Sequence, residues 1–279
     1  MSKGFLLIAQ NNSANNYVKQ AVYCAKRIKE FCKDASVSIV TNSVNYLEEN
    51  FDSTVFDYII DGNSLPKTPN NRMIFDGALS NRVVQWNNVG RDLAYDLTPY
   101  DETILLDTDY IFCNDNLNKC FGSVNDILMF KKSEYLGSNI TTDEFTRCAD
   151  SSIDFYWATI IYFKKSEKNR IFFDLVKHIR ENWFYYNNLY QINSANFRND
   201  YAFSIAIHTM NSMSPGEFVG ELPGKMYYIK DQDFLENIKY DKMTFLVGKK
   251  DHLGEYTLLS SKGLNIHVLN KASLEREIG

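Results

Sequence analysis

The stretch from Glu102 to Asp115, ETILLDTDYIFCND, places two aspartates at the end of an apolar run. The run 103–106 is short and continuous, which is typical of a strand buried on both faces of a parallel sheet. Asp107 and Asp109 follow it with one residue between them. Because two carboxylates this close repel each other, a positive group, most simply a divalent metal ion, is expected beside them.

Segments with strand and helix patterns alternate on both sides of this stretch. Apolar runs predict strands at 4–9, 37–41, 57–60, 103–106, 127–130 and 159–163. Helical periodicity predicts helices at 18–28, at 169–182 and from 199 through 206. This alternation predicts an α/β fold with a mainly parallel, Rossmann-like sheet flanked by helices. Further strand-like pieces at 225–230, 243–247 and 265–269 predict a smaller mixed C-terminal part.

Composition bounds the class of protein. With 279 residues, of which 44% are hydrophobic, the chain can bury a sizeable core, and without a repeat or linker it predicts a single domain over residues 1–279. A formal charge of -5 argues against binding nucleic acid or anionic membrane by bulk electrostatics. Five cysteines without a C-x-x-C pair favour a reduced, intracellular protein. No signal peptide or apolar membrane span is evident, so we expect a cytoplasmic protein of a bacterium or a phage-infected cell.

Two loops are expected to form the functional site. In open sheets of this class, ligands bind at the carboxyl ends of the strands. Asp107 and Asp109 lie at such an end, and Gln10 and Asn11 follow the first strand. The carboxylate oxygens of Asp107 and Asp109 suit Mg²⁺ or Mn²⁺, which would bridge them to a substrate diphosphate. An EF-hand is excluded because apolar residues stand where a ligand and the glycine belong.

Four segments, in this order, resemble the GT-A glycosyltransferases of the glycogenin and lipopolysaccharide-galactosyltransferase type, which are family 8-like. They are AQNNSANNYVKQAVYCAKRI (9–28), GRDLAYDLTPYDETILLDTDYIF (90–112), FYWATIIYFKKSEKNRIFFDLV (155–176) and NIHVLNKASLE (265–275). The shared pattern around the second segment is an arginine, an apolar half-turn, a Pro-Tyr-Asp turn and a strand ending in D-x-D. The resemblance touches both ends of the chain.

The resemblance implies a GT-A fold, with a nucleotide-sugar-binding half at 1–130 and an acceptor-side half at 131–279. It implies a metal ion, Mn²⁺ or Mg²⁺, held by Asp107, Asp109 and His267. It implies a nucleotide-sugar donor, favoured to be a UDP-sugar, bound by Gln10, Asn11, Tyr17, Arg91 and Lys271.

The implied reaction moves a sugar to an acceptor hydroxyl. A proton acceptor, if the reaction inverts, would be Asp200 or Asp154. The family's Asp-Gln pair appears here as Asn199-Asp200-Tyr201, which leaves the stereochemistry open, with retention favoured. The acceptor is a saccharide, a protein hydroxyl or a hydroxymethylated DNA base of the kind phages glycosylate, and the aromatic stretch 183–190 is a candidate acceptor wall.

Other functions stay open from sequence. A haloacid-dehalogenase-like phosphatase also has D-x-D after an apolar strand, although usually after the first one. A non-catalytic nucleotide-sugar binding module would bind the same ligands. A pyrophosphorylase is disfavoured because no glycine-rich loop follows the first strand. Without the family order, His267 between two apolar residues of a strand would be interpreted as structural. The sequence predicts no oligomeric state.

Overall fold

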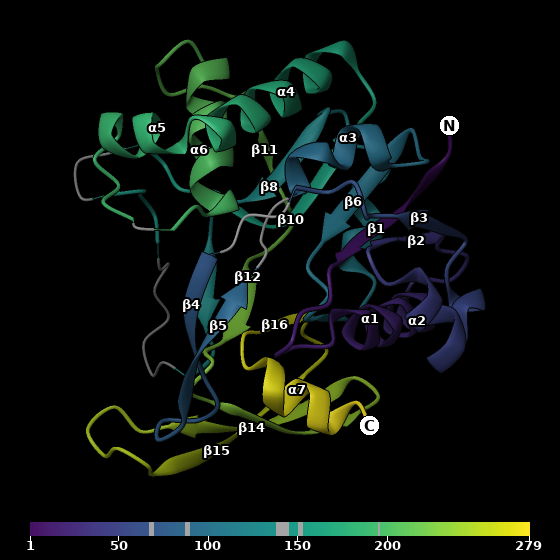
Figure 1. The fold of residues 1–279 in the computed structure, drawn as a ribbon, viewed down its shortest axis with the longest axis vertical. Helices are drawn as coiled ribbons and strands as arrows, with labels where there is room; N and C mark the ends of the chain where they lie inside the picture. Colours follow the sequence, from purple (N-terminus) through teal and green to yellow (C-terminus); the bar gives the residue numbers. More distant parts are fainter. Residues whose placement is uncertain (67–69, 87–89, 138–144, 150–152, 195) are drawn as a thin grey trace.

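A seven-stranded sheet in the order β11-β8-β10-β6-β1-β2-β3 runs through the middle of the molecule (Figure 1). The computed structural model describes residues 1–66, 70–86, 90–137, 145–149, 153–194 and 196–279. The strands of this sheet are β1 (Lys3–Ala9), β2 (Val37–Thr41), β3 (Tyr58–Asp61), β6 (Glu102–Leu106), β8 (Ile127–Phe130), β10 (Trp157–Lys164) and β11 (Gly220–Glu221).

The strands of the large sheet are mainly parallel. β3, β2, β1 and β6 run side by side in one direction, and β10 is antiparallel to both of its neighbours, β6 and β8. Leu7 of β1 lies opposite Leu106 of β6 and Ile39 of β2. The carboxyl ends of β1 and β6 are therefore adjacent, and the loops after them meet at one edge. The predicted fold class is confirmed.

Helices cover both faces of this sheet (Figure 1). α1 and α2 lie on one side, and α3, α4 and α6 lie on the other. The helices are α1 (Tyr17–Phe31), α2 (Val44–Asn50), α3 (Ala94–Leu97), α4 (Glu167–Glu181), α5 (Trp183–Leu189), α6 (Asn199–Met210) and α7 (Lys271–Glu277), with 3-10 helices η1 (Ser53–Val55), η2 (Arg91–Leu93) and η3 (Asn116–Cys120). Among the described residues, no helix has both the length and the apolar character needed to cross a membrane.

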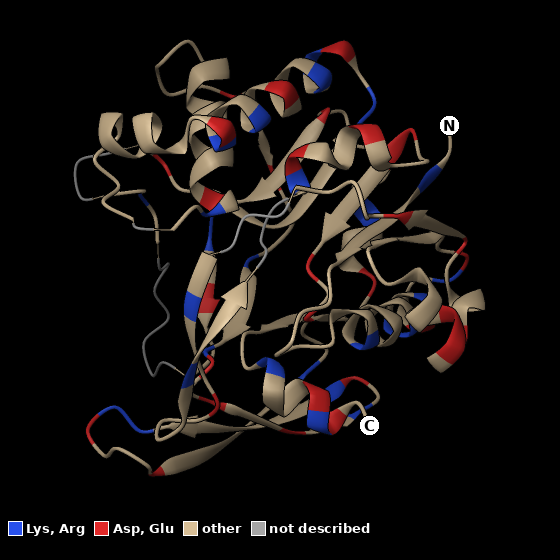
Figure 2. Ribbon diagram, in the orientation of Figure 1, with Lys and Arg blue, Asp and Glu red and all other residues tan. Residues whose placement is uncertain are grey.

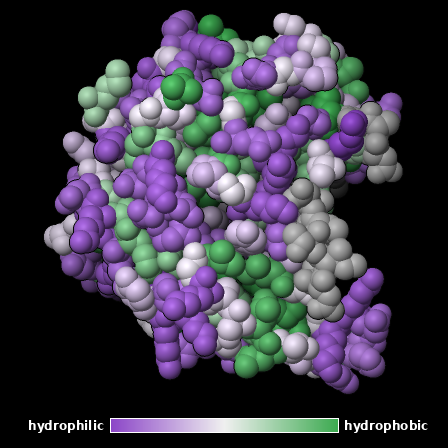
Figure 3. Space-filling view, turned by 180° about the vertical axis from the view of Figure 1, so that it is seen from behind, coloured by the Kyte–Doolittle hydropathy of each residue, from purple (hydrophilic) through white to green (hydrophobic). Residues whose placement is uncertain are grey.

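Three smaller sheets adjoin the large one. A four-stranded sheet has the order β7-β16-β12-β9, a three-stranded sheet has the order β13-β14-β15, and β4 and β5 form a hairpin. Their strands are β4 (Asn70–Phe75), β5 (Asn81–Trp86), β7 (Tyr110–Ile111), β9 (Ser133–Tyr135), β12 (Met226–Ile229), β13 (Phe234–Lys239), β14 (Lys242–Gly248), β15 (Tyr256–Lys262) and β16 (Ile266–Val268). The reverse face shows hydrophobic residues over its lower part, on the side of the three-stranded sheet (Figure 3).

Every strand and helix predicted above is present, with shifts of a few residues at the ends. The sequence did not predict the hairpin β4–β5. It also did not predict the strands β7, β9, β11, β13 and β15 or the helices α2, α3, α5 and α7. Most side chains of the hairpin are exposed or half-buried, so it lacks the apolar run that marks a buried strand. The division into a donor half and an acceptor half stays a prediction.

Candidate active site

The chain leaves the large sheet at Asp107 and enters the four-stranded sheet three residues later, at Tyr110. The Tyr110 N–H donates to the Asp107 carbonyl (3.3 Å), which closes a tight turn, and β7 begins at Tyr110. β7 pairs with β16 antiparallel, with Tyr110 opposite His267. The Val268 N–H also donates to the Asp109 carbonyl (3.0 Å). This short strand pairing brings a histidine from near the end of the chain to the D-x-D turn.

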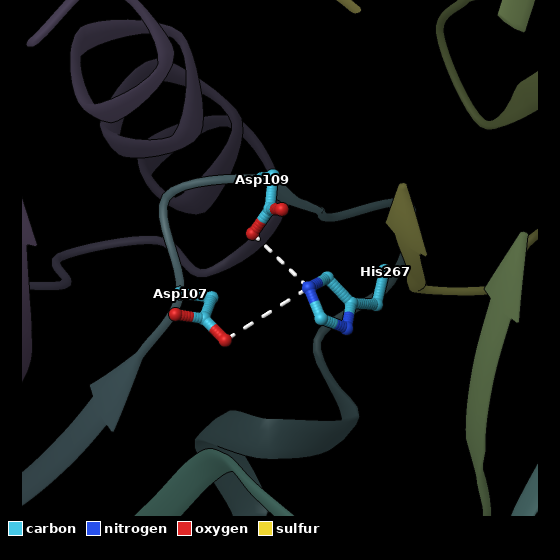
Figure 4. A group of neighbouring side chains, drawn as sticks. All are labelled: Asp107, Asp109 and His267. Carbon is cyan, nitrogen blue, oxygen red and sulfur yellow. Dashed lines mark hydrogen bonds and ion pairs between the residues drawn. The ribbon is translucent and has the colours of Figure 1, made fainter. Parts of the chain in front are cut away.

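Asp107, Asp109 and His267 converge on one point (Figure 4). The imidazole Nε2 of His267 lies 3.1 Å from Asp109 Oδ1 and 3.8 Å from Asp107 Oδ2. One ligand atom from each residue falls within 4.8 Å of the others. The Asp109 side chain is 3% exposed and that of Asp107 is 34% exposed, so the cluster opens to solvent on the Asp107 side.

Two basic residues neutralise the outer oxygens of these carboxylates. Lys271, the first residue of α7, donates to Asp109 Oδ2, and Arg91 donates to Asp107 Oδ1. Burial by itself would raise the pKa of Asp109, but the charges of Lys271 and His267 outweigh it, and the pKa lies well below the usual range of a carboxyl. Burial lowers the pKa of Lys271, but the charges of Asp109 and Tyr17 and the hydrogen bond to Asp109 together raise it above its ordinary value. Both groups are therefore charged at neutral pH.

Arg91 is held in place from several directions. Gly90, with φ at 110°, turns the chain into η2, a conformation that glycine adopts without strain. Asp92 is buried and accepts from Arg180 Nε (3.0 Å), which ties this turn to α4. Burial lowers the pKa of Arg91 to about 10, against the opposing charges of Asp200 and Asp109, so the guanidinium stays cationic at neutral pH.

The donor set of the triad fits a divalent cation. Two carboxylate oxygens and one imidazole nitrogen suit Mn²⁺ or Mg²⁺. Metal–ligand bonds of about 2.1 Å at right angles place adjacent ligands roughly 3 Å apart. The 3.1 Å separation of His267 Nε2 from Asp109 Oδ1 is of this size. His267 Nδ1 is buried and has no hydrogen-bond partner among the described residues, so the part of the chain that the structure describes does not orient the ring through this atom.

A cavity of about 480 Å³ opens beside the triad. Its walls include Gln10, Tyr17 and Trp157 as well as the triad, Arg91 and Lys271. Gln10 Nε2 and Trp157 Nε1 are buried donors without a hydrogen-bond partner among the described residues. Buried donors of this kind are satisfied when a ligand brings acceptor oxygens, which sugars and phosphates both carry.

Asp200 lines the same cavity from the first turn of α6. Its Oδ1 accepts from the Ala158 N–H (2.9 Å) and its Oδ2 accepts from Arg198 (2.8 Å). Arg91 also donates to the Ala158 carbonyl. Asp200 and Arg91 thus fix the start of β10 from its two sides.

Two of the predicted site residues do not line this cavity. The Asn11 side chain forms hydrogen bonds within its own loop and with the start of α1. Its Oδ1 accepts from the Val18 N–H (2.9 Å), and its Nδ2 donates to Asn16 (3.3 Å). Asp154 binds Lys131 Nζ (2.6 Å). Their assignment to binding and to proton transfer stays a prediction.

The aromatic stretch 183–190 also lies outside the cavity wall. Trp183 stacks on Tyr201 with an interplanar angle of 11°, and its ring meets the ring of Phe197 edge-on. It therefore supports segment 196–201, which does line the cavity. Phe184 is 80% exposed.

Sequence reasoning missed several residues of the cavity wall. The main ones are Arg72, Trp86, Trp157, Arg198 and Lys230. Arg198 lies two residues before Asp200, and Trp157 lies two residues before the predicted strand 159–163, so their positions offered a signal. Arg72 and Trp86, which lie in the hairpin β4–β5, were not marked by any sequence pattern.

No family model matches the sequence, and no curated protein matches it. Glycosyltransferases are among the solved structures similar to it. GlyE from Streptococcus pneumoniae TIGR4 aligns with 80% of this chain and 46% of its own, at 10% identity and a TM-score of 0.41. The galactosyltransferase LgtC, in complex with donor and acceptor sugar analogues, aligns with 73% of this chain and 70% of its own, at 12% identity and a TM-score of 0.43. The bifunctional IspDF from Campylobacter jejuni aligns with 81% of this chain and 50% of its own, at 12% identity and a TM-score of 0.38.

The chain spans about half the length of GlyE. Likeness at this level does not assign an activity to the chain.

Proposed function

We propose that this chain is a metal-dependent glycosyltransferase that moves a sugar from a UDP-sugar to an acceptor hydroxyl. The observation that carries the proposal is the convergence of Asp107, Asp109 and His267, together with Lys271, at the wall of a cavity of about 480 Å³. Breaking a sugar–phosphate bond leaves a diphosphate whose growing negative charge needs fixed positive charge nearby. The cluster supports that need with a cation site and a buried ammonium group.

Each residue of the cluster has a part in this proposal. A divalent ion held by the triad would act as a Lewis acid on the leaving diphosphate. Lys271, held by Asp109, adds a second positive charge beside it. Arg91 orients the Asp107 carboxylate by binding its other oxygen. The Tyr17 ring forms a wall of the cavity against which the nucleoside would pack.

The surroundings of the two candidate bases favour retention of configuration. A carboxylate whose two oxygens both accept hydrogen bonds within the protein is held in place and is less able to turn toward an acceptor hydroxyl. Asp200 is in this state, bound by Arg198 and the Ala158 N–H. Asp154 is bound to Lys131 and does not line the cavity. Asp200 then acts as a positioning residue for the start of β10.

A donor screen tests this proposal. Purified protein is incubated with UDP- and GDP-sugars, with saccharide acceptors and with hydroxymethylated DNA, in the presence of Mn²⁺ or of a chelator. We expect UDP release that requires Mn²⁺ and is lost in Asp109→Asn. Release of phosphate from a simple phosphomonoester, with no use of nucleotide sugars, would favour the phosphatase instead. Binding of UDP and Mn²⁺ without turnover of any donor would favour a binding module.

A further inference from the structure

A second cavity of about 330 Å³ adjoins the first. The two cavities share the side chains of Tyr17, Arg72, Trp86, Leu269 and Lys271. One side of the second cavity is the hairpin β4–β5, and the other is the start of α7. Because Lys271 also binds Asp109, a ligand group at this junction lies next to the candidate metal centre.

Basic side chains outnumber acidic ones around the second cavity. Its charged residues are Arg72, Arg82, Lys271 and Arg276 on the basic side and Asp76 and Asp231 on the acidic side. Arg72 and Arg82 belong to the hairpin, and Lys271 and Arg276 belong to α7. Figure 2 shows basic segments on both elements. Lys271 and Arg276 are already bound to carboxylates, of Asp109 and Asp76 respectively. The cavity therefore has positive charge in excess.

Arg72 differs from the other basic residues at the junction. Its guanidinium lies over the Trp86 ring, 4.8 Å from the ring centroid. It is half-buried, and within the described part of the chain it has no carboxylate at ion-pair distance. A half-buried cation between two cavities, without a carboxylate partner, is stabilised when an anionic ligand group enters.

We infer that Arg72 is an anion-binding residue, which takes a phosphate group of the substrate at the junction of the two cavities. The planar guanidinium fork matches two phosphate oxygens, and stacking on Trp86 holds the fork in one plane. As a role in catalysis, this inference rests on the proposed function. The phosphate is carried either by the nucleotide donor or by the acceptor, and the chemistry of recognition is the same for both.

The first experiment measures calorimetric dissociation constants for UDP and for uridine with Mn²⁺. The variants are Arg72→Gln, Arg72→Lys and, as the control, Arg170→Gln, which removes an exposed arginine of α4 that lines neither cavity. If the nucleotide carries the phosphate, Arg72→Gln weakens UDP binding by about tenfold or more and leaves uridine binding unchanged. Arg72→Lys recovers part of the loss because it restores the charge without the fork. An equal loss in Arg170→Gln would overturn the inference, because the effect would then be a general loss of positive charge.

The second experiment tests the acceptor as the source. Inorganic phosphate is titrated into protein already saturated with UDP and Mn²⁺, with the melting temperature as readout. Stabilisation by phosphate that is lost in Arg72→Gln assigns the phosphate to the acceptor. The inference is overturned if neither experiment distinguishes Arg72→Gln from the unmodified protein.

A third measurement separates this inference from the proposed function. Inorganic phosphate alone is titrated without nucleotide and without metal. Stabilisation that is lost in Arg72→Gln but kept in Asp109→Asn supports the anion site even if the protein uses no nucleotide sugar. A different result would overturn the anion site but not the proposed function. In that case Arg72→Gln binds UDP with Mn²⁺ as tightly as the unmodified protein, and phosphate stabilises neither protein.

Discussion

His267 can be interpreted as a structural residue or as a metal ligand. Both kinds of histidine commonly bond through both ring nitrogens, so the second nitrogen does not separate the two roles. Here Nε2 faces two carboxylates, whereas Nδ1 has no partner among the described residues. Its polar contacts are therefore concentrated on the atom that faces the D-x-D turn.

We predict that His267→Ala reduces Mn²⁺ affinity and turnover together. Loss of outer-shell support alone costs roughly 10–100-fold in metal affinity, so loss of a ligand should cost at least about tenfold. The measurements are the Mn²⁺ dependence of UDP release and the melting temperature. His252→Ala, in an exposed loop, is the control and should leave the Mn²⁺ dependence unchanged. A large fall in melting temperature with an unchanged Mn²⁺ requirement would return His267 to a structural role.

At the scale of elements, the hairpin β4–β5 and α7 form the two sides of the second cavity, and both contact the three-stranded sheet. Gly77, in the hairpin turn, has φ at 81°, and a Cβ there would lie 2.2 Å from the Phe234 ring of β13. The start of α7 is fixed by Asn270, whose side chain accepts from the Ser273 N–H (2.9 Å) and donates to the Asp233 carbonyl (2.8 Å). The position of Arg72 and Lys271 therefore depends on the packing of these elements.

We predict that Gly77→Ala destabilises the protein more than Gly122→Ala. Both glycines have positive φ, which costs an alanine about 1 kcal/mol, but at Gly122 no atom lies within 4 Å of the added carbon. The clash with Phe234 should add about 1–3 kcal/mol. Urea unfolding midpoints of the two variants make the comparison. Equal destabilisation would mean that the hairpin turn does not pack on β13 in solution.

The ion pair between Asp76 and Arg276 links the hairpin turn to α7, and its contribution to stability should depend on pH. Asp76 accepts two hydrogen bonds from Arg276 (2.8 and 2.9 Å), and chiefly for this reason its pKa is lowered. A carboxyl with a lowered folded-state pKa contributes stability above its unfolded pKa, and the contribution is lost as the pH falls through the folded value. Because both side chains are about one-third exposed or more, the contribution is less than about 1 kcal/mol.

We predict, accordingly, a small loss of melting temperature in Arg276→Gln at neutral pH, which shrinks as the pH is lowered through the acid range. Melting curves of both proteins across that range test it. A difference that grows toward low pH would contradict the assignment of the loss to this ion pair.

At the scale of the whole molecule, the candidate site exists only when several parts are assembled. The large sheet supplies Asp107, the four-stranded sheet supplies His267, and α7 supplies Lys271. In the unfolded chain these residues are far apart, so a ligand of the assembled site binds the folded state alone.

We predict that UDP with Mn²⁺ raises the melting temperature in a concentration-dependent way. Ligand at one hundred times its dissociation constant stabilises the folded state by about 2.7 kcal/mol. UDP with chelator is the control, and Asp109→Asn should remove the Mn²⁺-dependent part. Unchanged melting with every nucleotide and metal combination would contradict the proposed site.

Much of the large sheet could be predicted from the sequence. A strand buried on both faces must be apolar along its length, so β1, β2 and β6 each leave a local signature. The apolar run of β6 also predicts that the D-x-D lies at the end of this strand, because Asp107 follows the run directly. The hairpin β4–β5 leaves no such signature because much of it is exposed.

By itself the sequence determined the alternation of strands and helices and the two carboxylates at a strand end, because both depend on neighbouring residues. Only the tertiary structure decided which distant groups meet them. His267 reaches Asp109 through the pairing of β16 with β7, across 158 positions of the chain, and Arg72 reaches the cavity through the packing of a hairpin. Strand pairing and packing between distant segments minimise the free energy of the whole chain, so no local pattern encodes them.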